Sequence, residues 1–294
     1  MTIRNVYYEI TSFHTLMIAD THVSKGKREN TERLRFYDNR EGNLEEISTL
    51  LRAGKVPKVE YHSFYVYVPK VRKVIFIDYW SKVVQRAIYD VLNPKICRTF
   101  IEHTYACVKG RGQLAAMEQL YTWMRETRTS GTEWYYYKFD VAKFFYRIDH
   151  EILMDICRKK IDDPRTVDLL GYYINNDAVP FGMPLDANQL TITEEQMLYD
   201  LGIPIGGGLS HMLGNMYLDP LDQFCKRVLG IKRYIRYMDD IIILDNDKER
   251  LREYGRRMAR FLEERLHLNF NNKTALRPVR VGCEFVGYVI YDDH

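Results

Sequence analysis

Short apolar stretches with the composition of β-strands cluster in the second half of the chain. Aromatic and β-branched residues fill Trp134 to Phe139, Tyr234 to Arg236 and Ile241 to Leu244, and this composition favours strands. Only a few residues, which include Asp239 and Asp240, separate the last two stretches. We therefore expect a hairpin that presents two adjacent carboxylates at its tip.

Helices are expected where apolar residues recur every three to four positions. This spacing marks residues 43–53, 81–92, 113–128, 149–160, 209–217 and 248–268. Asn43 is expected to cap the first of them. Thr193 and Gln196 have the spacing of a capping box and predict one further short helix. Strands and helices together predict an α+β fold.

Three other segments have distinct patterns. Residues 1–42 are polar and basic with little periodicity, so they predict no element. Residues 61–79 have the pattern of two strands joined by a basic turn. Residues 177–203 contain two prolines and two glycines, and we expect an irregular insertion there.

The composition is that of a folded protein with an uneven charge distribution. The 294 residues are 46% hydrophobic, which suffices for two subdomains around sizeable cores. The formal net charge is only +3, yet residues 55–128 hold 13 Lys and Arg against 6 Asp and Glu. A surface with this excess can follow phosphates, although a modest excess is also usual for a solvated face.

The cysteines and the hydropathy pattern indicate a cytoplasmic protein. The five cysteines, at positions 97, 107, 157, 225 and 283, form no CxxC pair and no zinc-like cluster with histidines. They fit reduced thiols in a cytosolic protein. No apolar run reaches the roughly 18 residues of a membrane span, so we expect no membrane partner.

Three carboxylates follow strands that we expect to be neighbours. Asp140 comes directly after the strand that begins at Trp134, and Asp239 and Asp240 form the hairpin tip. An ionised carboxylate is costly to bury unless it is paired or bound to a cation. Mg²⁺ prefers oxygen ligands, and two ions about 3.5–4 Å apart can serve phosphoryl transfer. The plainer alternative is a solvated Asp-Asp turn.

Three motifs carry a resemblance to a known family: Phe139 to Phe145, Pro204 to Ser210 and Tyr237 to Asp240. In this order and at these separations they resemble the palm motifs of reverse transcriptases, and the resemblance extends from about Tyr61 to Tyr291. It implies a right-hand polymerase with fingers and palm subdomains. The implied domains are an N-terminal extension at 1–54, fingers at 55–133, and a palm at 134–294 that contains the insertion at 177–203.

The resemblance also implies a role for individual residues. Asp140, Asp239 and Asp240, with the backbone carbonyl of Val141, would hold two Mg²⁺ ions, for which Mn²⁺ can substitute. The residues that would contact the incoming nucleotide are Arg72, Arg111, Phe145, Ile205, Gly206 and Lys273. Those of the primer grip are Phe285, Gly287 and Tyr288.

The chemistry of the nucleotide-binding residues suits these roles. The guanidinium of Arg72 can hold two phosphate oxygens, and Lys273 can protonate departing pyrophosphate. The ring of Phe145 would crowd a ribose 2′-OH, whereas the similar RNA-copying RNA polymerases usually have a carboxylate there. Ile205 stands where several reverse transcriptases have Gln and is similar to the diversity-generating class, which implies error-prone copying. A solvated hairpin tip, a surface lysine and a core phenylalanine are the plainer alternatives.

The implied activity is RNA-templated DNA synthesis on a primer 3′-OH by a reverse transcriptase of a bacterial or phage retroelement or defence system. The motifs are most similar to the diversity-generating and abortive-infection types. Fewer than ten residues follow the primer grip, which implies a short or absent thumb. Either the sequence is truncated before a thumb, or a dedicated non-coding RNA, an accessory protein or a second copy supplies the clamp. Template-independent or protein-primed synthesis of antiviral type and a non-enzymatic RNA-binding scaffold stay as alternatives.

Overall fold

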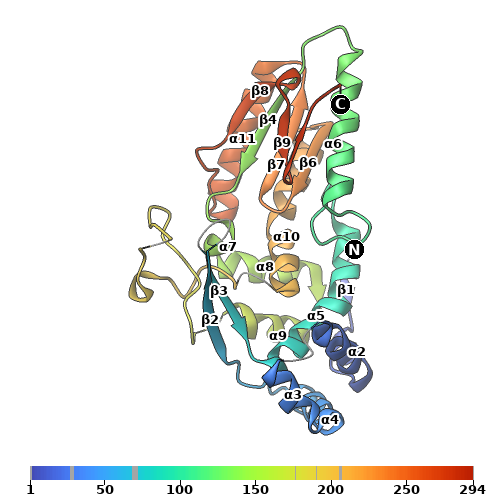
Figure 1. The fold of residues 1–294 in the computed structure, drawn as a ribbon, viewed down its shortest axis with the longest axis vertical. Helices are drawn as coiled ribbons and strands as arrows, with labels where there is room; N and C mark the ends of the chain where they lie inside the picture. Colours follow the sequence, from blue (N-terminus) through green and yellow to red (C-terminus); the bar gives the residue numbers. More distant parts are fainter. Residues whose placement is uncertain are drawn as a thin grey trace. The chain divides into compact units, whose positions relative to one another are not determined.

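The computed structural model describes residues 2–26, 30–67, 72–175, 177–189, 191–204 and 207–293. Helices and strands are mixed along the chain, and the strands form small sheets (Figure 1). This confirms the predicted α+β class. The chain forms two compact units, each built from two segments. The first contains Met1–Thr99 and His150–Leu213, and the second contains Phe100–Asp149 and Gly214–His294.

The first unit begins with helices that the sequence did not predict. They are α1 (Tyr7–Ile10), α2 (Phe13–Ser24) and α3 (Thr31–Tyr37), followed by α4 (Arg40–Arg52). The predicted cap Asn43 is wrong, because α4 starts at Arg40 and the Asn43 side chain donates to the carbonyl of Phe36.

A buried carboxylate explains why the pattern of α2 was misleading. Asp20 of α2 is fully buried. It accepts hydrogen bonds from Tyr79 at 2.7 Å, Tyr37 at 3.0 Å and Arg40 at 2.7 Å. A polar residue therefore occupies a core position of α2 and interrupts its apolar stripe.

The predicted strand pair at residues 61–79 is confirmed. The strands are β2 (Tyr61–Val66) and β3 (Arg72–Ile77), which are labelled in Figure 1. They pair antiparallel, with Tyr61 opposite Ile77. Of the basic turn predicted at residues 69–73, residues 69–71 lie outside the described residues, and Arg72 and Lys73 belong to β3. Asp78 then caps α5 (Tyr79–Ile96) by accepting from the amide of Ser81 at 2.9 Å. This helix is longer at both ends than the predicted range 81–92.

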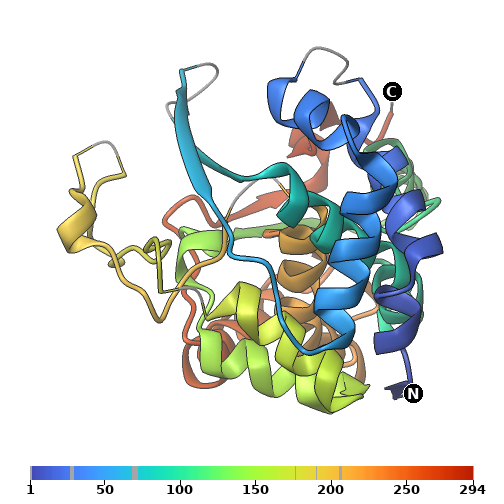
Figure 2. The same cartoon turned by 90° about the horizontal axis from the view of Figure 1, so that it is seen from below.

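The second segment of the first unit contains two helices and the predicted insertion. The elements are α8 (His150–Lys160), β5 (Ile161–Asp162), α9 (Pro164–Ile174) and the 3₁₀ turn η2 (Glu194–Gln196), and β5 pairs in parallel with β1 (Ile3–Arg4). The capping box of Thr193 and Gln196 is confirmed. The described residues of this insertion, 177–189 and 191–203, otherwise form irregular loops, drawn in yellow in Figures 1 and 2.

The second unit is built on a four-stranded antiparallel sheet in the order β6-β7-β4-β8. Its strands are β4 (Tyr135–Asp140), β6 (Arg233–Tyr237), β7 (Asp240–Asp245) and β8 (Ala275–Pro278). The helices are α6 (Gln113–Arg128), α7 (Phe144–Arg147), α11 (Lys248–Leu266) and α10 (Gly208–Gln223), which joins this unit at Gly214. The remaining elements are η1 (Cys97–Thr99) in the first unit, and η3 (Phe224–Val228), η4 (Val279–Val281) and a hairpin of β9 (Cys283–Phe285) and β10 (Tyr288–Ile290) in the second.

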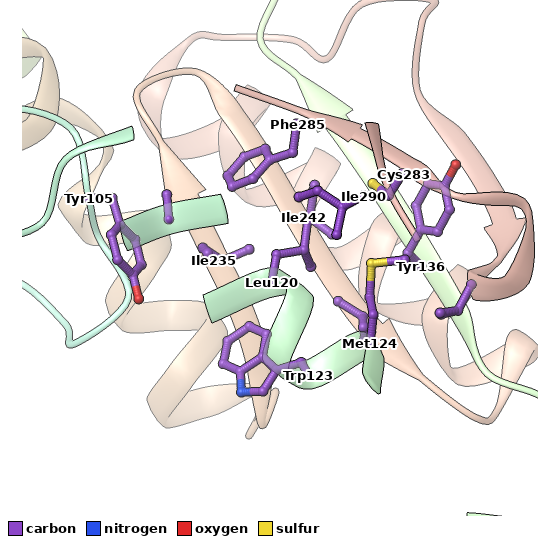
Figure 3. Packing of buried hydrophobic residues seen from close by; sticks show 13 residues of the cluster. Tyr105, Leu120, Trp123, Met124, Tyr136, Ile235, Ile242, Cys283, Phe285 and Ile290 are labelled. Atoms are coloured by element: carbon purple, nitrogen blue, oxygen red, sulfur yellow. The ribbon is translucent and has the colours of Figure 1, made fainter. Parts of the chain in front are cut away.

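Helix α6 and the β9–β10 hairpin cover one face of the sheet. Figure 3 shows Leu120 and Met124 of α6 directed toward Ile242 and Tyr136, and all four side chains are buried. Phe285 of β9 belongs to the same apolar cluster. The alternate residues of the strands face the other way: Tyr137 lies against Gly255 of α11, and Tyr234 and Arg236 contact Asp222 of α10. Burial on both faces explains why the central strands are nearly continuous apolar runs.

Within the described residues, none of the helices combines the length and apolar character needed to cross a membrane.

Candidate active site

The three aspartates lie at one end of the central strand pair β4–β7. Asp140 is the last residue of β4 and faces Asp240, the first residue of β7. Tyr237 of β6 also pairs with Asp240, so Met238 and Asp239 alone form the turn between β6 and β7. Asp240 is therefore a strand residue, not the turn residue that the sequence predicted, because its backbone is paired within the sheet.

Backbone hydrogen bonds fix the segment around Asp140. The amide of Val141 donates to the carbonyl of Asp239 at 3.3 Å, and the amide of Asn271 donates to the carbonyl of Asp140 at 2.8 Å. The amide of Lys273 in turn donates to the side chain of Asn271 at 2.9 Å. The backbone of Lys273 is thus tied to the aspartate end of the sheet, and its side chain is exposed.

Asp240 lies in surroundings that oppose its negative charge. Its side chain is 26% exposed, and its Oδ1 atom is buried without a hydrogen-bond partner among the described residues. Burial raises the pKa of Asp240 to about 7, and the charges of Asp140 and Asp239 add to this rise while Lys138 opposes it. A cation at Oδ1 would stabilise the ionised carboxylate.

Lys138 is the basic residue that contacts Asp240. Its Nζ lies 3.3 Å from Oδ2 of Asp240 and donates to the carbonyl of Glu284 in β9 at 2.7 Å. Sequence reasoning did not single out Lys138. The alternation of β4 was the signal that could have found it, since residues two apart share a face of a strand and Asp140 follows two positions later.

Arg236 is a second basic residue that sequence reasoning missed. It is fully buried in β6, forms an ion pair with Asp222 of α10 at 2.7 Å, and donates to the carbonyl of Met238 at 3.0 Å. No local pattern marks this pair, because Asp222 belongs to a separate helix. The carbonyl it holds belongs to the turn that carries Asp239.

The residues at this end of the sheet fit a divalent cation by their chemistry. In the part of the chain that the structure describes, no three His, Cys, Asp or Glu side chains are already gathered as metal ligands. The donors are nonetheless the oxygens that Mg²⁺ prefers, and Oδ1 of Asp240 is a buried acceptor. Asp140, Asp239 and Asp240, with the carbonyl of Val141, would hold such an ion.

The structure separates the two phenylalanines of the first motif. Phe144 is buried, whereas Phe145 is partly exposed. Gly214 of α10 lies against both rings, and an added Cβ there would lie 3.1 Å from Phe144 and 3.3 Å from Phe145. Phe144 is therefore a core residue, and Phe145 keeps a solvent-exposed surface.

The other predicted nucleotide contacts have varied surroundings. Arg111 is partly buried and donates to the carbonyl of Ile101 at 3.0 Å. Arg72 begins β3 in the first unit, and its side chain lies outside the described residues. Ile205 and Gly206 lie outside them entirely.

The predicted primer-grip residues form the tip of the β9–β10 hairpin. Val286 and Gly287 occupy the two turn positions with φ of +47° and +84°, the combination typical of a type I′ turn. The Phe285 side chain is fully buried, so only its backbone can face a ligand, whereas Tyr288 is 45% exposed. Gln113 of α6 donates to the carbonyl of Val286 and anchors the tip.

An antiparallel sheet covered by helices, with facing aspartates at the end of its central strands, defines the class as a polymerase palm. The family model described as reverse transcriptase (RNA-dependent DNA polymerase) matches residues 56–290, and the chain belongs to this family. Members of the family generally use divalent metal ions and bind a nucleic acid template and primer.

One curated relative is Protein YkfC of Escherichia coli (strain K12). It is 23% identical to this chain over 260 residues, which cover 76% of the chain and 65% of YkfC. The chain thus spans slightly less than two thirds of the length of this relative.

Proposed function

We propose that the chain catalyses RNA-templated DNA synthesis from a primer 3′-OH. The observation that carries this proposal is the register of the palm sheet, in which Asp140 faces Asp240 within the region that matches the family. A pair of carboxylates at adjoining strand ends, with Asp239 in the neighbouring turn, supports binding of two Mg²⁺ or Mn²⁺ ions.

Each residue has a defined task in the proposed reaction, which joins the primer 3′-oxygen to the α-phosphate of a deoxynucleotide and releases pyrophosphate. Bound Mg²⁺ ions would activate the 3′-OH and stabilise the leaving oxygen. Asp140, Asp239 and Asp240 would hold them in place. The exposed side of Phe145 would lie under the sugar and exclude a ribose 2′-OH.

Basic residues would offset the charge of the triphosphate, because phosphoryl transfer depends mainly on positioning and electrostatic stabilisation. Lys273 is suited to this by its exposed ammonium and by its link through Asn271 to Asp140. Arg72 and Arg111, which lie elsewhere in the sequence, are proposed to contact the phosphates of the nucleotide. Ile205 and Gly206 are proposed to contact the incoming nucleotide, with Ile205 lowering fidelity.

The test is extension of a DNA primer annealed to an RNA template with Mg²⁺, using deoxynucleotides or ribonucleotides, beside a lane without template. We expect template-dependent deoxynucleotide incorporation that Asp239→Ala reduces roughly a hundred-fold or more. Asp155→Ala, a change of an exposed aspartate in α8, is the matched control and should leave activity unchanged. Phe145→Ala should raise ribonucleotide use relative to deoxynucleotide use.

Other results would identify other functions. Incorporation that persists without a template would replace the proposal with terminal or protein-primed synthesis. RNA binding without incorporation in any lane, and without Mn²⁺ binding, would indicate a scaffold.

A further inference from the structure

Arg236 uses every donor of its buried guanidinium. Nε and Nη2 donate to the two carboxylate oxygens of Asp222 at 2.8 and 2.7 Å. Nη1 donates to Oδ1 of Asn215 at 2.9 Å and to the carbonyl of Met238 at 3.0 Å, and Nη2 also reaches the carbonyl of Asn215 at 3.5 Å. Arginine has five N–H donors in a fixed planar arrangement. The guanidinium is therefore held in one orientation.

The partners of Arg236 are themselves fixed. Asp222 also accepts from the hydroxyls of Tyr234 at 2.6 Å and Thr104 at 2.9 Å. Asn215 donates to the carbonyl of Ala106 at 2.7 Å. All of these side chains are fully or almost fully buried. Among the described residues, every side chain that this hydrogen-bond network joins is therefore buried, which restricts their movement.

One contact of Arg236, with the carbonyl of Met238, lies in the turn between β6 and β7. Met238 is the first residue of the two-residue turn and has φ of +53°. This region is unfavourable for a side chain as large as methionine, so surrounding contacts must hold the residue there. The carbonyl that Arg236 holds belongs to the peptide group between Met238 and Asp239.

Stability alone does not account for the ion pair. A buried ion pair contributes little net stability compared with apolar side chains that fill the same volume. Apolar residues in place of Arg236 and Asp222 could extend the surrounding core. They could not donate a hydrogen bond to the carbonyl of Met238.

We infer that Arg236 is a positioning residue, which fixes the peptide group before Asp239 and thereby orients the carboxylates of Asp239 and Asp240. This inference rests on the proposed function for its effect on rate. Its structural part, a hold on the turn, is independent of that function.

The test compares the wild-type protein with the double variant Arg236→Met/Asp222→Asn. Removing both charges avoids an unpaired buried ion, and the amide introduced at position 222 would still accept from Tyr234 and could donate to Thr104. The matched control is Arg233→Met, which changes an arginine of the same strand that pairs instead with Glu126.

Two measurements separate positioning from folding. Amide hydrogen exchange of residues 237–241 should accelerate at least about ten-fold in the double variant, while exchange in α11 and the thermal midpoint stay close to those of the wild type. In single-nucleotide extension, kcat should fall at least about ten-fold with little change in KM for the primer–template, because a small displacement of a catalytic group has large effects. Arg233→Met should change neither.

The outcomes decide the two proposals separately. Wild-type exchange in the turn of the folded double variant, or an unchanged kcat, would overturn the role of Arg236. Faster exchange in a protein that never extends primers would support the hold on the turn and contradict the proposed function. If the double variant does not fold, Arg236→Lys replaces it, since one ammonium cannot reproduce the planar set of donors to Asp222 and Met238, and the same criteria apply.

Discussion

At the scale of single residues, two basic side chains contact the β6–β7 hairpin that carries Asp239 and Asp240, and they act in different ways. Lys138 contacts Asp240 directly and links it to the carbonyl of Glu284. Arg236 pairs with Asp222 and acts on the backbone of the turn. Asp240 itself is largely withdrawn from water, and its Oδ1 atom has no hydrogen-bond partner among the described residues. Its charge state should therefore depend on pH and on cations near neutrality.

The first prediction concerns pH and the stability of the metal-free protein. The pKa of Asp240 is about 7 in the folded protein against an ordinary value of 3.8. Between these values the folded state keeps a proton that the unfolded state has lost. The contribution of Asp240 to the free energy of unfolding should thus fall as pH rises from about 4 to about 7, by up to about 1.4 kcal/mol per pH unit. Urea unfolding with EDTA at several pH values measures this contribution when the wild type is compared with Asp240→Asn.

The comparison isolates Asp240 because all other titrating groups are common to both proteins. The stability of Asp240→Asn relative to the wild type should increase across this range, whereas Asp155→Asn should follow the wild-type curve. Mn²⁺ added above pH 7 should stabilise the wild type more than Asp240→Asn. Parallel curves for the wild type and Asp240→Asn would contradict the raised pKa.

At the scale of elements, the packing of α11 on the palm sheet leaves no spare volume at its centre. Gly255 of α11 is buried against Tyr137 of β4. A Cβ added to Gly255 would lie 2.6 Å from the Cε1 atom of this ring. The ring of Phe139 lies 4.2 Å from that of Tyr137, so the tyrosine cannot move freely along the strand. The glycine thus sets how closely the helix approaches the sheet.

The second prediction follows from this contact. Alanine is favoured over glycine in a helix by about 1 kcal/mol, but overpacking a core costs about 1–3 kcal/mol. We expect Gly255→Ala to lower the free energy of unfolding by about 1 kcal/mol, measured by urea denaturation. Tyr137→Val removes the clashing ring, so Gly255→Ala should be neutral or stabilising in that background. Destabilisation of equal size in both backgrounds would show that the clash is not the cause.

At the scale of the whole molecule, a small net charge conceals a basic region. The total is +3, whereas residues 55–128 alone contain 13 basic and 6 acidic side chains, so the rest of the chain is acidic. Neutralising phosphates releases counterions, which makes nucleic acid binding sensitive to salt. The net charge of the protein is therefore a poor guide to its affinity for a primer–template.

The third prediction tests this view with Lys109, an exposed residue close to Arg111 in the sequence. Affinity for an RNA–DNA hybrid should fall linearly on a plot of log affinity against log salt concentration. Lys109→Ala should reduce the slope by about 0.7–0.9, the contribution of one phosphate contact. Fluorescence anisotropy over a salt series gives the slope. Arg256→Ala removes an exposed arginine of α11 that pairs with Glu253 and should leave the slope unchanged. Equal slopes for the wild type and both variants would contradict a role for residues 55–128 in binding phosphates.

The sequence by itself determined the elements whose signals are local. Helix α6 spans Gln113–Arg128 as predicted, and α11 and the two palm hairpins lie close to their predicted positions. Periodicity, caps and turn residues act over a few positions, so they can be read without knowing the fold. The order of the motifs likewise indicated the family. The roles of the individual site residues stay predictions.

The motifs predicted that Asp140 lies near Asp239 and Asp240, but only the tertiary structure decided the strand register and the partners of the other distant residues. The register that sets Asp140 opposite Asp240 joins strands about 100 positions apart, and the contact of Lys138 with β9 spans a longer separation still. The buried polar groups Asp20 and Arg236 were unpredictable for the same reason. A charged side chain is tolerated in a core only when its partners surround it, and the fold alone brings those partners together.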